Sequence, residues 1–210
     1  MSDKIVITIA RQYGSGGREI GEKVADILGI KHYDENLITL AAQAGNLDET
    51  VASRADESAA SSLLYTLALG SNFFGSAVNF GYKPPLNDKL FLLQSDVIRR
   101  AAAEGSCVII GRCADYVLRE HPKRLSIFIY GDLAHRKERV MQRHEGITEA
   151  QAIDLINKTD RRRSSYYNFY TGNKWGKYDN YHLAVNSSLL GIDKTAEMIA
   201  DAAKLLMEKE

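Results

Sequence analysis

The chain has 210 residues, of which 45% are hydrophobic, with 27 Lys and Arg side chains balanced by 27 Asp and Glu. A chain of this length buries about 70% of its unfolded surface, which suits one domain. Balanced charge argues against a nucleic-acid or membrane-surface binder. With only two cysteines and neither a signal peptide nor a membrane-spanning run, a reduced protein of the cytoplasm is expected.

The N-terminal segment carries the strongest functional signal. A β-branched run at 5–9 predicts a buried strand, and a helical pattern at 18–28 follows the sequence Gly14-Ser15-Gly16-Gly17. A strand that turns through glycines into a helix points free N–H groups and the positive end of the helix dipole at one spot. These four residues and Arg18 are therefore expected to bind phosphate, with a plain turn as the alternative.

The loop departs from the phosphate-binding pattern G-x-x-x-x-G-K-[ST]. With Gly16 as the second glycine, Arg11 occupies the first glycine position, Gly17 the lysine position and Arg18 the hydroxyl position. Arg18 can offer a cation and Ser15 a hydroxyl, although a planar guanidinium does not replace a lysine. Phosphate binding is thus better supported than catalysis.

Further along the chain, short apolar strands alternate with amphipathic helices. Strands are predicted at 31–33, 107–110, 126–130 and 182–186, and helices at 35–44, 88–104, 114–120, 133–144, 148–163 and 192–208. Asp34 is a candidate N-cap, and Thr148 with Gln151 matches a capping box. Strands separated by helices predict a parallel sheet with helices on both faces.

Two segments break this alternation. Residues 46–87 begin acidic, become apolar and contain Lys83-Pro84-Pro85 near their end, which predicts an inserted helical lobe or flap. Residues 164–180 carry aromatic side chains between polar ones, which predicts a loop that folds over a ligand. The alternative is that these aromatic residues pack against the body or a partner subunit.

Arginine suits phosphoryl transfer because it is always charged and binds oxygens bidentately. Six arginines lie between residues 136 and 163, and Arg136, Arg139 and Arg143 share one predicted helix face, with a solvated basic face as the alternative. Arg112 follows a strand and a glycine, at the edge where open parallel sheets bind ligands. The histidines show no metal-ligand spacing with the cysteines, so no metal ligands are assigned.

The order of these motifs resembles the cytidylate-kinase-like group of P-loop nucleoside monophosphate kinases. The matching stretches are residues 28–34 (Leu-Gly…Tyr-Asp), 108–112 (the Asp-Gly-Arg-Asp strand end), 160–164 (the lid segment Asp-x-Arg-Asp-Ser) and 186–188. The match covers most of the chain and is weakest over residues 46–87. It departs where Ile110 and Cys113 replace the aspartates that flank Gly-Arg.

The resemblance implies a three-layer α/β/α P-loop kinase fold with a parallel sheet, in a single domain over residues 1–210. Residues 46–87 would be the inserted lobe and residues 136–180 a mobile lid region. ATP is the implied phosphoryl donor, with Mg²⁺ as cofactor but no ligands identified, and the partners are small-molecule nucleotides rather than nucleic acid or membrane. The oligomeric state stays open.

The resemblance also assigns roles to individual residues. Arg112, with Asp115 and Asp34, would bind the acceptor. Arginines of the lid region would act on the transferring phosphates, with Arg162 favoured by the lid motif and the others being Arg161, Arg143 and Arg139.

The leading hypothesis is ATP-dependent phosphoryl transfer to a pyrimidine nucleoside monophosphate such as CMP. A nucleotide-binding regulatory or assembly protein without transfer activity is an alternative, favoured by Gly17 and Ile110 in place of the expected lysine and aspartate. A kinase of a non-nucleotide acceptor is another, because the altered positions beside Arg112 leave the acceptor pocket open.

Overall fold

A computed structural model of the protein describes residues 4–34 and 86–208. Its described strands form one five-stranded sheet in the order β2-β3-β1-β4-β5, with every neighbouring pair parallel. The strands are β1 (Val6–Arg11), β2 (Lys31–Tyr33), β3 (Cys107–Ile110), β4 (Arg124–Tyr130) and β5 (Leu183–Asn186). The prediction of a parallel sheet is confirmed.

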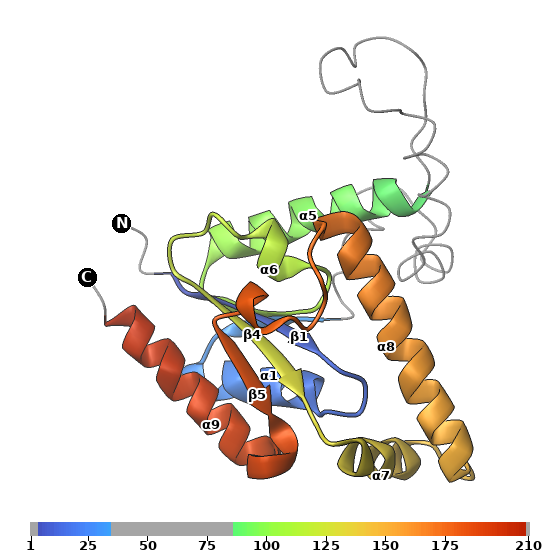
Figure 1. Ribbon diagram of the computed structural model, residues 1–210. Helices are drawn as coiled ribbons and strands as arrows, with labels where there is room; N and C mark the ends of the chain where they lie inside the picture. The colour runs from blue at the N-terminus through green and yellow to red at the C-terminus, as the bar shows by residue number, and fades with distance from the viewer. Residues whose placement is uncertain (1–3, 35–85, 209–210) are drawn as a thin grey trace, which may run out of the picture.

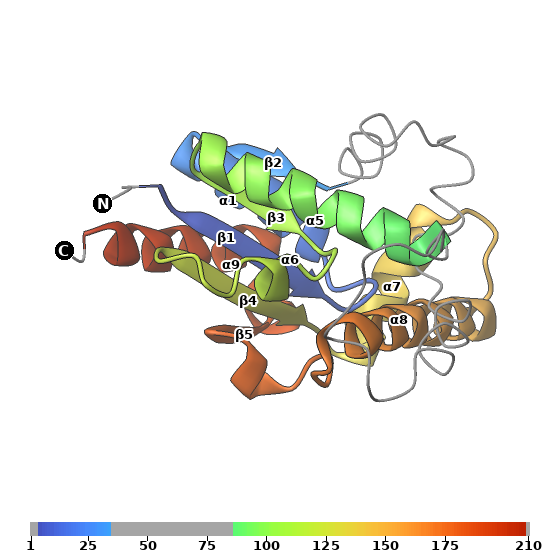
Figure 2. The same cartoon turned by 90° about the horizontal axis from the view of Figure 1, so that it is seen from above.

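Helices cover both faces of this sheet, which gives the predicted three-layer α/β/α fold (Figure 1, Figure 2). One face carries α1 (Gly17–Leu28) and α9 (Ser187–Met207), and the other carries α5 (Leu86–Glu104) and α6 (Ala114–Val117). Beyond the carboxyl ends of the strands lie α7 (Leu133–Arg143) and α8 (Glu149–Thr171). A short 3₁₀ helix, Tyr178–Asn180, precedes β5.

The central strand β1 is buried on both faces. Ile7 and Ile9 join the apolar cluster under α1 and α9, whereas Val6 joins the cluster under α5 and α6. This division follows from the two-residue period of a strand. Because both faces are covered, the sequence of β1 is an almost continuous run of apolar residues and does not alternate between apolar and polar ones.

Helix α8 is longer than its sequence pattern predicts. The expected loop at 164–180 is wrong in its first half, because the helix continues to Thr171 and ends at Gly172 with a left-handed φ of 70°. Tyr166 and Tyr167 are buried, and the ring of Tyr170 stacks on Phe91 of α5 with centroids 4.1 Å apart. Packing against α5 therefore keeps this aromatic segment helical. The capping box at Thr148 is confirmed.

Helix α9 begins five residues before its predicted start. The Asn186 side chain accepts a hydrogen bond from the Ser188 N–H and caps the first turn. Gly191, at φ 72°, then interrupts the helix with a kink. The predicted helix at 35–44 and the predicted lobe at 46–87 lie outside the described residues, except that 86 and 87 open α5.

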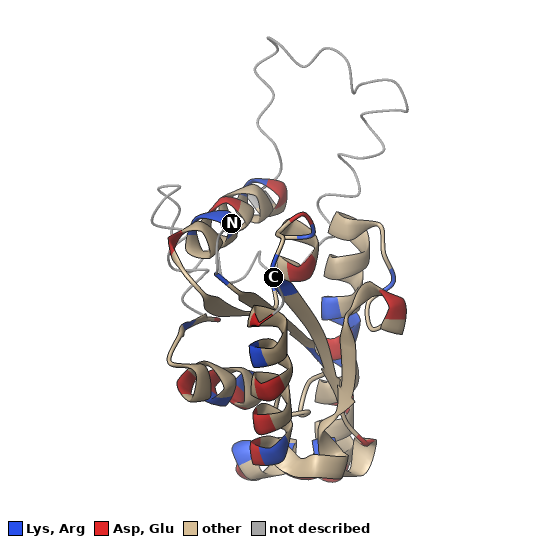
Figure 3. Ribbon diagram, turned by 90° about the vertical axis from the view of Figure 1, so that its left-hand side faces the viewer, with Lys and Arg blue, Asp and Glu red and all other residues tan. Residues whose placement is uncertain are grey.

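The outer helices carry acidic and basic residues close together (Figure 3). Among the described helices, none combines the length and the apolar character that a membrane span requires. Cys107 and Cys113 are both buried, and neither forms a disulfide.

Candidate phosphate and acceptor site

The carboxyl ends of the neighbouring strands β1 and β3 form the centre of the site. After β1 the chain enters α1 on one face of the sheet, and after β3 it enters α6 on the other. Open parallel sheets bind ligands in the crevice at such a point. Two loops therefore meet here: the glycine-rich loop at 12–16 and the loop that contains Arg112.

The glycine-rich loop has the geometry of a phosphate cradle. Gly14 and Gly16 have φ values of 80° and 77°, as the glycine-rich pattern predicts. Gly16 is the N-cap of α1, and no side chain caps that end. The first N–H groups of α1 thus keep the positive end of the helix dipole open to an anion.

The two polar side chains predicted to assist this loop have other contacts. The Ser15 hydroxyl is buried and donates to the carbonyl oxygens of Gln12 at 2.9 Å and Ile129 at 3.3 Å. In this structure the Ser15 hydroxyl therefore faces backbone carbonyls, and its role in phosphate binding stays a prediction. The Arg18 Nε lies 3.0 Å from a Glu22 carboxylate oxygen and 3.2 Å from one of Asp34. Arg18 is thus turned along α1 rather than over the loop.

Helices α7 and α8 hold the loop from outside through one backbone unit. Arg136 Nε donates to the Tyr13 carbonyl oxygen at 2.7 Å, and the Tyr13 N–H donates to Asp160 Oδ1 at 2.7 Å. The Arg136 guanidinium also pairs with the other Asp160 oxygen. This Arg136–Asp160 clamp joins the predicted lid region to the phosphate loop. The sequence placed Arg136 among the arginines suited to phosphoryl transfer and Asp160 in the lid motif, but it did not predict their contact with the loop.

Two predicted catalytic arginines lie beside the same loop. Arg139 Nη2 is 2.8 Å from Glu19 Oε2 in the first turn of α1, and Arg143 Nη2 is 3.6 Å from that oxygen. Arg139 also lines a cavity of about 370 Å³ with Gly14, Ser15 and the beginning of α9. The structure therefore brings Arg139 to the cradle and keeps Arg143 next to it.

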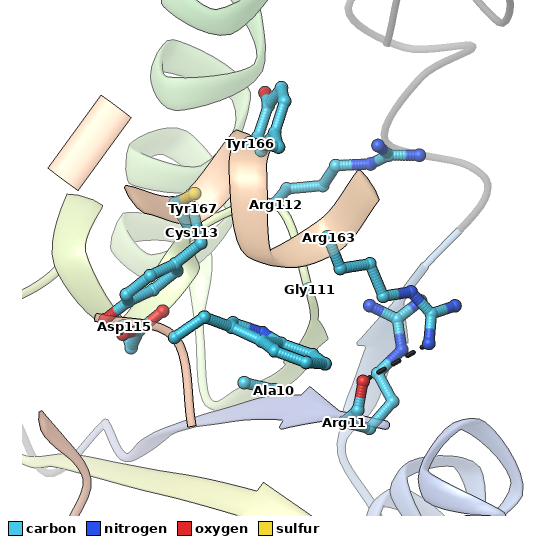
Figure 4. A pocket seen from close by; sticks show the side chains of 10 residues that line it. Ala10, Arg11, Gly111, Arg112, Cys113, Asp115, Arg163, Tyr166 and Tyr167 are labelled. Carbon is cyan, nitrogen blue, oxygen red and sulfur yellow. Dashed lines mark hydrogen bonds between the residues drawn. The ribbon is translucent and has the colours of Figure 1, made fainter. Parts of the chain in front are cut away.

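A second, smaller pocket opens on the β3 side of the loop (Figure 4). Three arginines from three separate elements line this arginine pocket: Arg11 at the end of β1, Arg112 after β3, and Arg163 of α8. Arg163 Nη1 donates to the Arg11 carbonyl oxygen at 3.2 Å. The remaining lining residues are Ala10, Gly111, Cys113, Asp115, Tyr166, Tyr167 and Trp175.

Of three consecutive arginines in α8, the structure brings Arg163 to the arginine pocket. Arg161 and Arg162, which the sequence favoured, have exposed side chains. A signal for Arg163 exists in the sequence, because Tyr166, Tyr167 and Tyr170 follow it at i+3, i+4 and i+7 and therefore share its helix face. That signal requires α8 to extend to Thr171, and the predicted helix ended too early to show it.

The predicted acceptor residues lie in or next to the arginine pocket. Arg112 has φ 56°, and desolvation, with a smaller effect of Arg11, lowers the pKa of its guanidinium to about 10, so it stays charged at neutral pH. Asp115 is buried and accepts a hydrogen bond from Tyr167 Oη at 2.7 Å. Burial raises the pKa of Asp115, and this hydrogen bond partly opposes the shift. Asp34 lies beside the pocket, 3.5 Å from Arg11.

Comparison with known proteins identifies the family. The model of the cytidylate kinase-like family matches residues 6–189. The chain belongs to the cytidylate kinase-like family. Membership in this family supports phosphoryl transfer as the general activity of the chain, and it does not identify the acceptor.

Solved structures of other proteins share the fold. An uncharacterized protein from Eubacterium ventriosum ATCC 27560 is 28% identical and superimposes with a TM-score of 0.69, over 96% of this chain and 99% of that one. Shikimate kinase from Bacteroides thetaiotaomicron is 12% identical, with a TM-score of 0.53 over 95% and 98% of the two chains, and shows the fold alone. No curated protein sequence matches this member of the family.

P-loop kinases generally use Mg²⁺ with ATP, and they hold the ion with one or two side chains together with the substrate phosphates. Within residues 4–34 and 86–208, no three His, Cys, Asp or Glu side chains cluster as metal ligands. The P-loop position that supplies a hydroxyl to Mg²⁺ in the standard pattern is Arg18, and the Ser15 hydroxyl faces backbone carbonyls. No step of the reaction is therefore assigned to the metal.

Proposed function

We propose that this protein transfers the γ-phosphoryl group of ATP to a small anionic acceptor, and that the acceptor is a pyrimidine nucleoside monophosphate such as CMP. In this reaction the bond from the γ-phosphorus to the β,γ-bridging oxygen breaks and its electron pair leaves with ADP. A new bond forms between the γ-phosphorus and a phosphate oxygen of the acceptor, and any proton on that oxygen is released.

One observation carries the proposal: Arg11, Arg112 and Arg163 converge in a pocket next to the helix N-terminus that would hold the ATP phosphates. Phosphoryl transfer depends on charge neutralisation and in-line positioning more than on acid–base chemistry. Guanidinium groups on one side of the transferring group and backbone N–H groups on the other supply both. Arg112 would bind the acceptor phosphate, as its motif suggests.

The other walls of the arginine pocket suit a planar acceptor that carries hydrogen-bond donors. Asp115 offers a carboxylate, and Tyr167 holds one of its oxygens at 2.7 Å. Trp175 and Tyr166 line the same pocket and provide aromatic surface for stacking. A cytosine ring has an exocyclic amine and a flat face, so CMP would use both features.

A non-nucleotide acceptor is the second candidate function. It is favoured by Ile110 and Cys113, which stand where the cytidylate kinase motif has aspartates, and by the small volume of the arginine pocket, about 40 Å³. A compact phosphorylated or carboxylated acceptor would use the same arginines without needing room for a base and a ribose.

An acceptor screen tests the proposal. ADP release from ATP is measured with CMP, UMP, dCMP and a panel of compact phosphorylated and carboxylated compounds, against a control without acceptor. Turnover fastest with CMP or UMP supports the nucleotide proposal, and turnover only with a compact acid supports the second candidate. Nucleotide binding without turnover on any acceptor would contradict transfer and favour a binding protein.

A further inference from the structure

Two of the departures from the P-loop pattern in this chain are in direct contact. The standard pattern has glycine at its first position and lysine at its seventh, whereas here Arg11 and Gly17 occupy those positions. A Cβ atom added to Gly17 would lie 2.5 Å from the Cβ and 2.9 Å from the Cγ of Arg11. A side chain at position 17 is therefore incompatible with the present path of the Arg11 side chain.

The outer end of Arg11 lies against a second glycine. A Cβ atom added to Gly111, after β3, would lie 2.2 Å from Arg11 Nη1. The Arg11 side chain thus starts against Gly17 in the phosphate loop and ends against Gly111 beside Arg112. It crosses from the cradle to the arginine pocket, which is the path that the transferring group must bridge.

Arg11 is held in this position rather than extended into solvent. Its side chain is 18% exposed, and Nη2 lies 3.5 Å from Asp34 Oδ1, a carboxylate that also pairs with Arg18. Its guanidinium lies next to that of Arg163 in the close view (Figure 4). Two adjacent guanidinium groups repel each other, and an anion bound between them would relieve that repulsion.

We propose that Arg11 supplies the cation that a lysine supplies in the standard P-loop, from the first position of the pattern instead of the seventh. Gly17 is then a glycine because Arg11 needs the space above it. A guanidinium can bind two oxygens of the γ-phosphate at once and remains charged as the bond to the β-phosphate breaks. This inference rests on the proposed function, because it requires ATP as the ligand.

The first test compares ATP with ADP in binding to Arg11→Met, which keeps the aliphatic stem over Gly17 and removes the charge. Calorimetry should show ATP affinity lowered about 10- to 100-fold, the usual effect of losing a charge-assisted contact, with a smaller loss for ADP. Arg99→Met is the matched control, because Arg99 pairs with Asp96 on the exposed side of α5. It should leave both affinities unchanged.

The second test exchanges the two positions. Gly17→Lys alone should bind ATP poorly, because its Cβ collides with Arg11, and Arg11→Gly alone should lose the preference for ATP over ADP. The double variant R11G/G17K restores the standard residues at the first and seventh positions, and it should recover both ATP binding and the preference for ATP over ADP.

The results separate the two proposals. A folded Arg11→Met protein with the wild-type ATP-to-ADP preference would overturn the role of Arg11, as would a folded double variant no better than Arg11→Gly. Arg11→Gln replaces Arg11→Met if the latter fails to fold, as judged by thermal unfolding. Wild-type protein that binds neither nucleotide would instead overturn the proposed function.

Discussion

At the scale of single residues, one position along a helix decides which guanidinium enters a pocket. Successive residues of an α-helix point about 100° apart, so three arginines in a row cannot face one ligand. Arg163 lines the arginine pocket and bonds to Arg11, whereas Arg161 and Arg162 are exposed. The lid motif in the sequence favoured Arg162, and the structure transfers that hypothesis to Arg163.

We therefore predict different effects of two neighbouring substitutions. Arg163→Ala should lower kcat about 10²- to 10³-fold, similar to the loss of one donor to a developing charge, whereas Arg162→Ala should be nearly silent. Steady-state kinetics with the acceptor found in the screen provide the measurement. The reverse order of effects would show that Arg162 reaches the phosphates in the working enzyme.

At Asp115 the proposed role in acceptor binding conflicts with the stability of the fold. Burial raises its folded-state pKa above the unfolded value, so the folded protein binds the proton more tightly. The stability from this proton is complete below the unfolded pKa and is lost as the pH rises through the folded pKa. At neutral pH the buried carboxylate is thus destabilising.

Asp115→Asn should consequently raise the free energy of unfolding at pH 7 by about 1 kcal/mol while it lowers acceptor affinity. The gain should vanish as the pH falls below about 4, where an ordinary aspartate is protonated. Urea unfolding at several pH values measures this, with the exposed Asp201→Asn as control. A variant less stable than wild type at pH 7 would show that the charged hydrogen bond from Tyr167 outweighs desolvation.

At the scale of elements, the Arg136–Asp160 clamp connects α7 and α8 to the phosphate loop. Both polar groups of the Tyr13 backbone unit are used, its carbonyl by Arg136 and its N–H by Asp160. The side chains of the pair are 8% and 17% exposed, so the pair is shielded from water and salt. The position of the loop is therefore tied to the packing of these two helices.

Removing Arg136 should leave the Asp160 carboxylate shielded from water, with the Tyr13 N–H as a partner but without its cation. Arg136→Met is expected to reduce the free energy of unfolding by about 3 kcal/mol and to weaken ATP binding, because the Tyr13 carbonyl loses its donor. Arg99→Met, in a pair with 58% and 56% exposed side chains, should cost less than about 1 kcal/mol. Equal effects in urea unfolding would show that the clamp adds no stability.

The sequence predicted element types better than element lengths. The glycine-rich loop, α1 and the strands near 5–9 and 107–110 follow from local patterns that agree with their environment. The end of α8 does not, because Tyr166 and Tyr170 are helical through contacts with Phe91, about 75 positions earlier in the chain. Local periodicity contains no information about such a partner.

At the scale of the whole molecule, the class of fold follows from the alternation of strands and helices, but the strand order does not. That β3 pairs with both β1 and β2 is settled by tertiary packing. The same order makes Gly111 a neighbour of Arg11, so the relation between Arg11, Gly17 and Gly111 is visible only in three dimensions. Sequence reasoning recorded Arg11 and Gly17 as two separate defects of the P-loop.

The effect of a mutation in the glycine-rich loop also depends on contacts that are visible only in three dimensions. A Gly16→Val substitution is an obvious way to block phosphate binding at the loop. In the structure a Cβ atom on Gly16 would lie 2.2 Å from Cδ1 of Ile192 in α9, and the residue has a positive φ. Such a variant would disturb the packing of α9 as well, so Arg11→Met is the cleaner probe of the cradle.

In the proposed reaction, the γ-phosphoryl group of ATP moves to a nucleoside monophosphate at the carboxyl edge of β1 and β3. The most direct measurement uses ATP labelled with ¹⁸O in the γ-phosphoryl group, incubated with CMP and the protein, with the products weighed by mass spectrometry. If the chain transfers the group to CMP, the label should appear in CDP, and Arg112→Ala should sharply slow its appearance. Label that remains in ATP, or that appears only in inorganic phosphate, would contradict transfer to a nucleoside monophosphate.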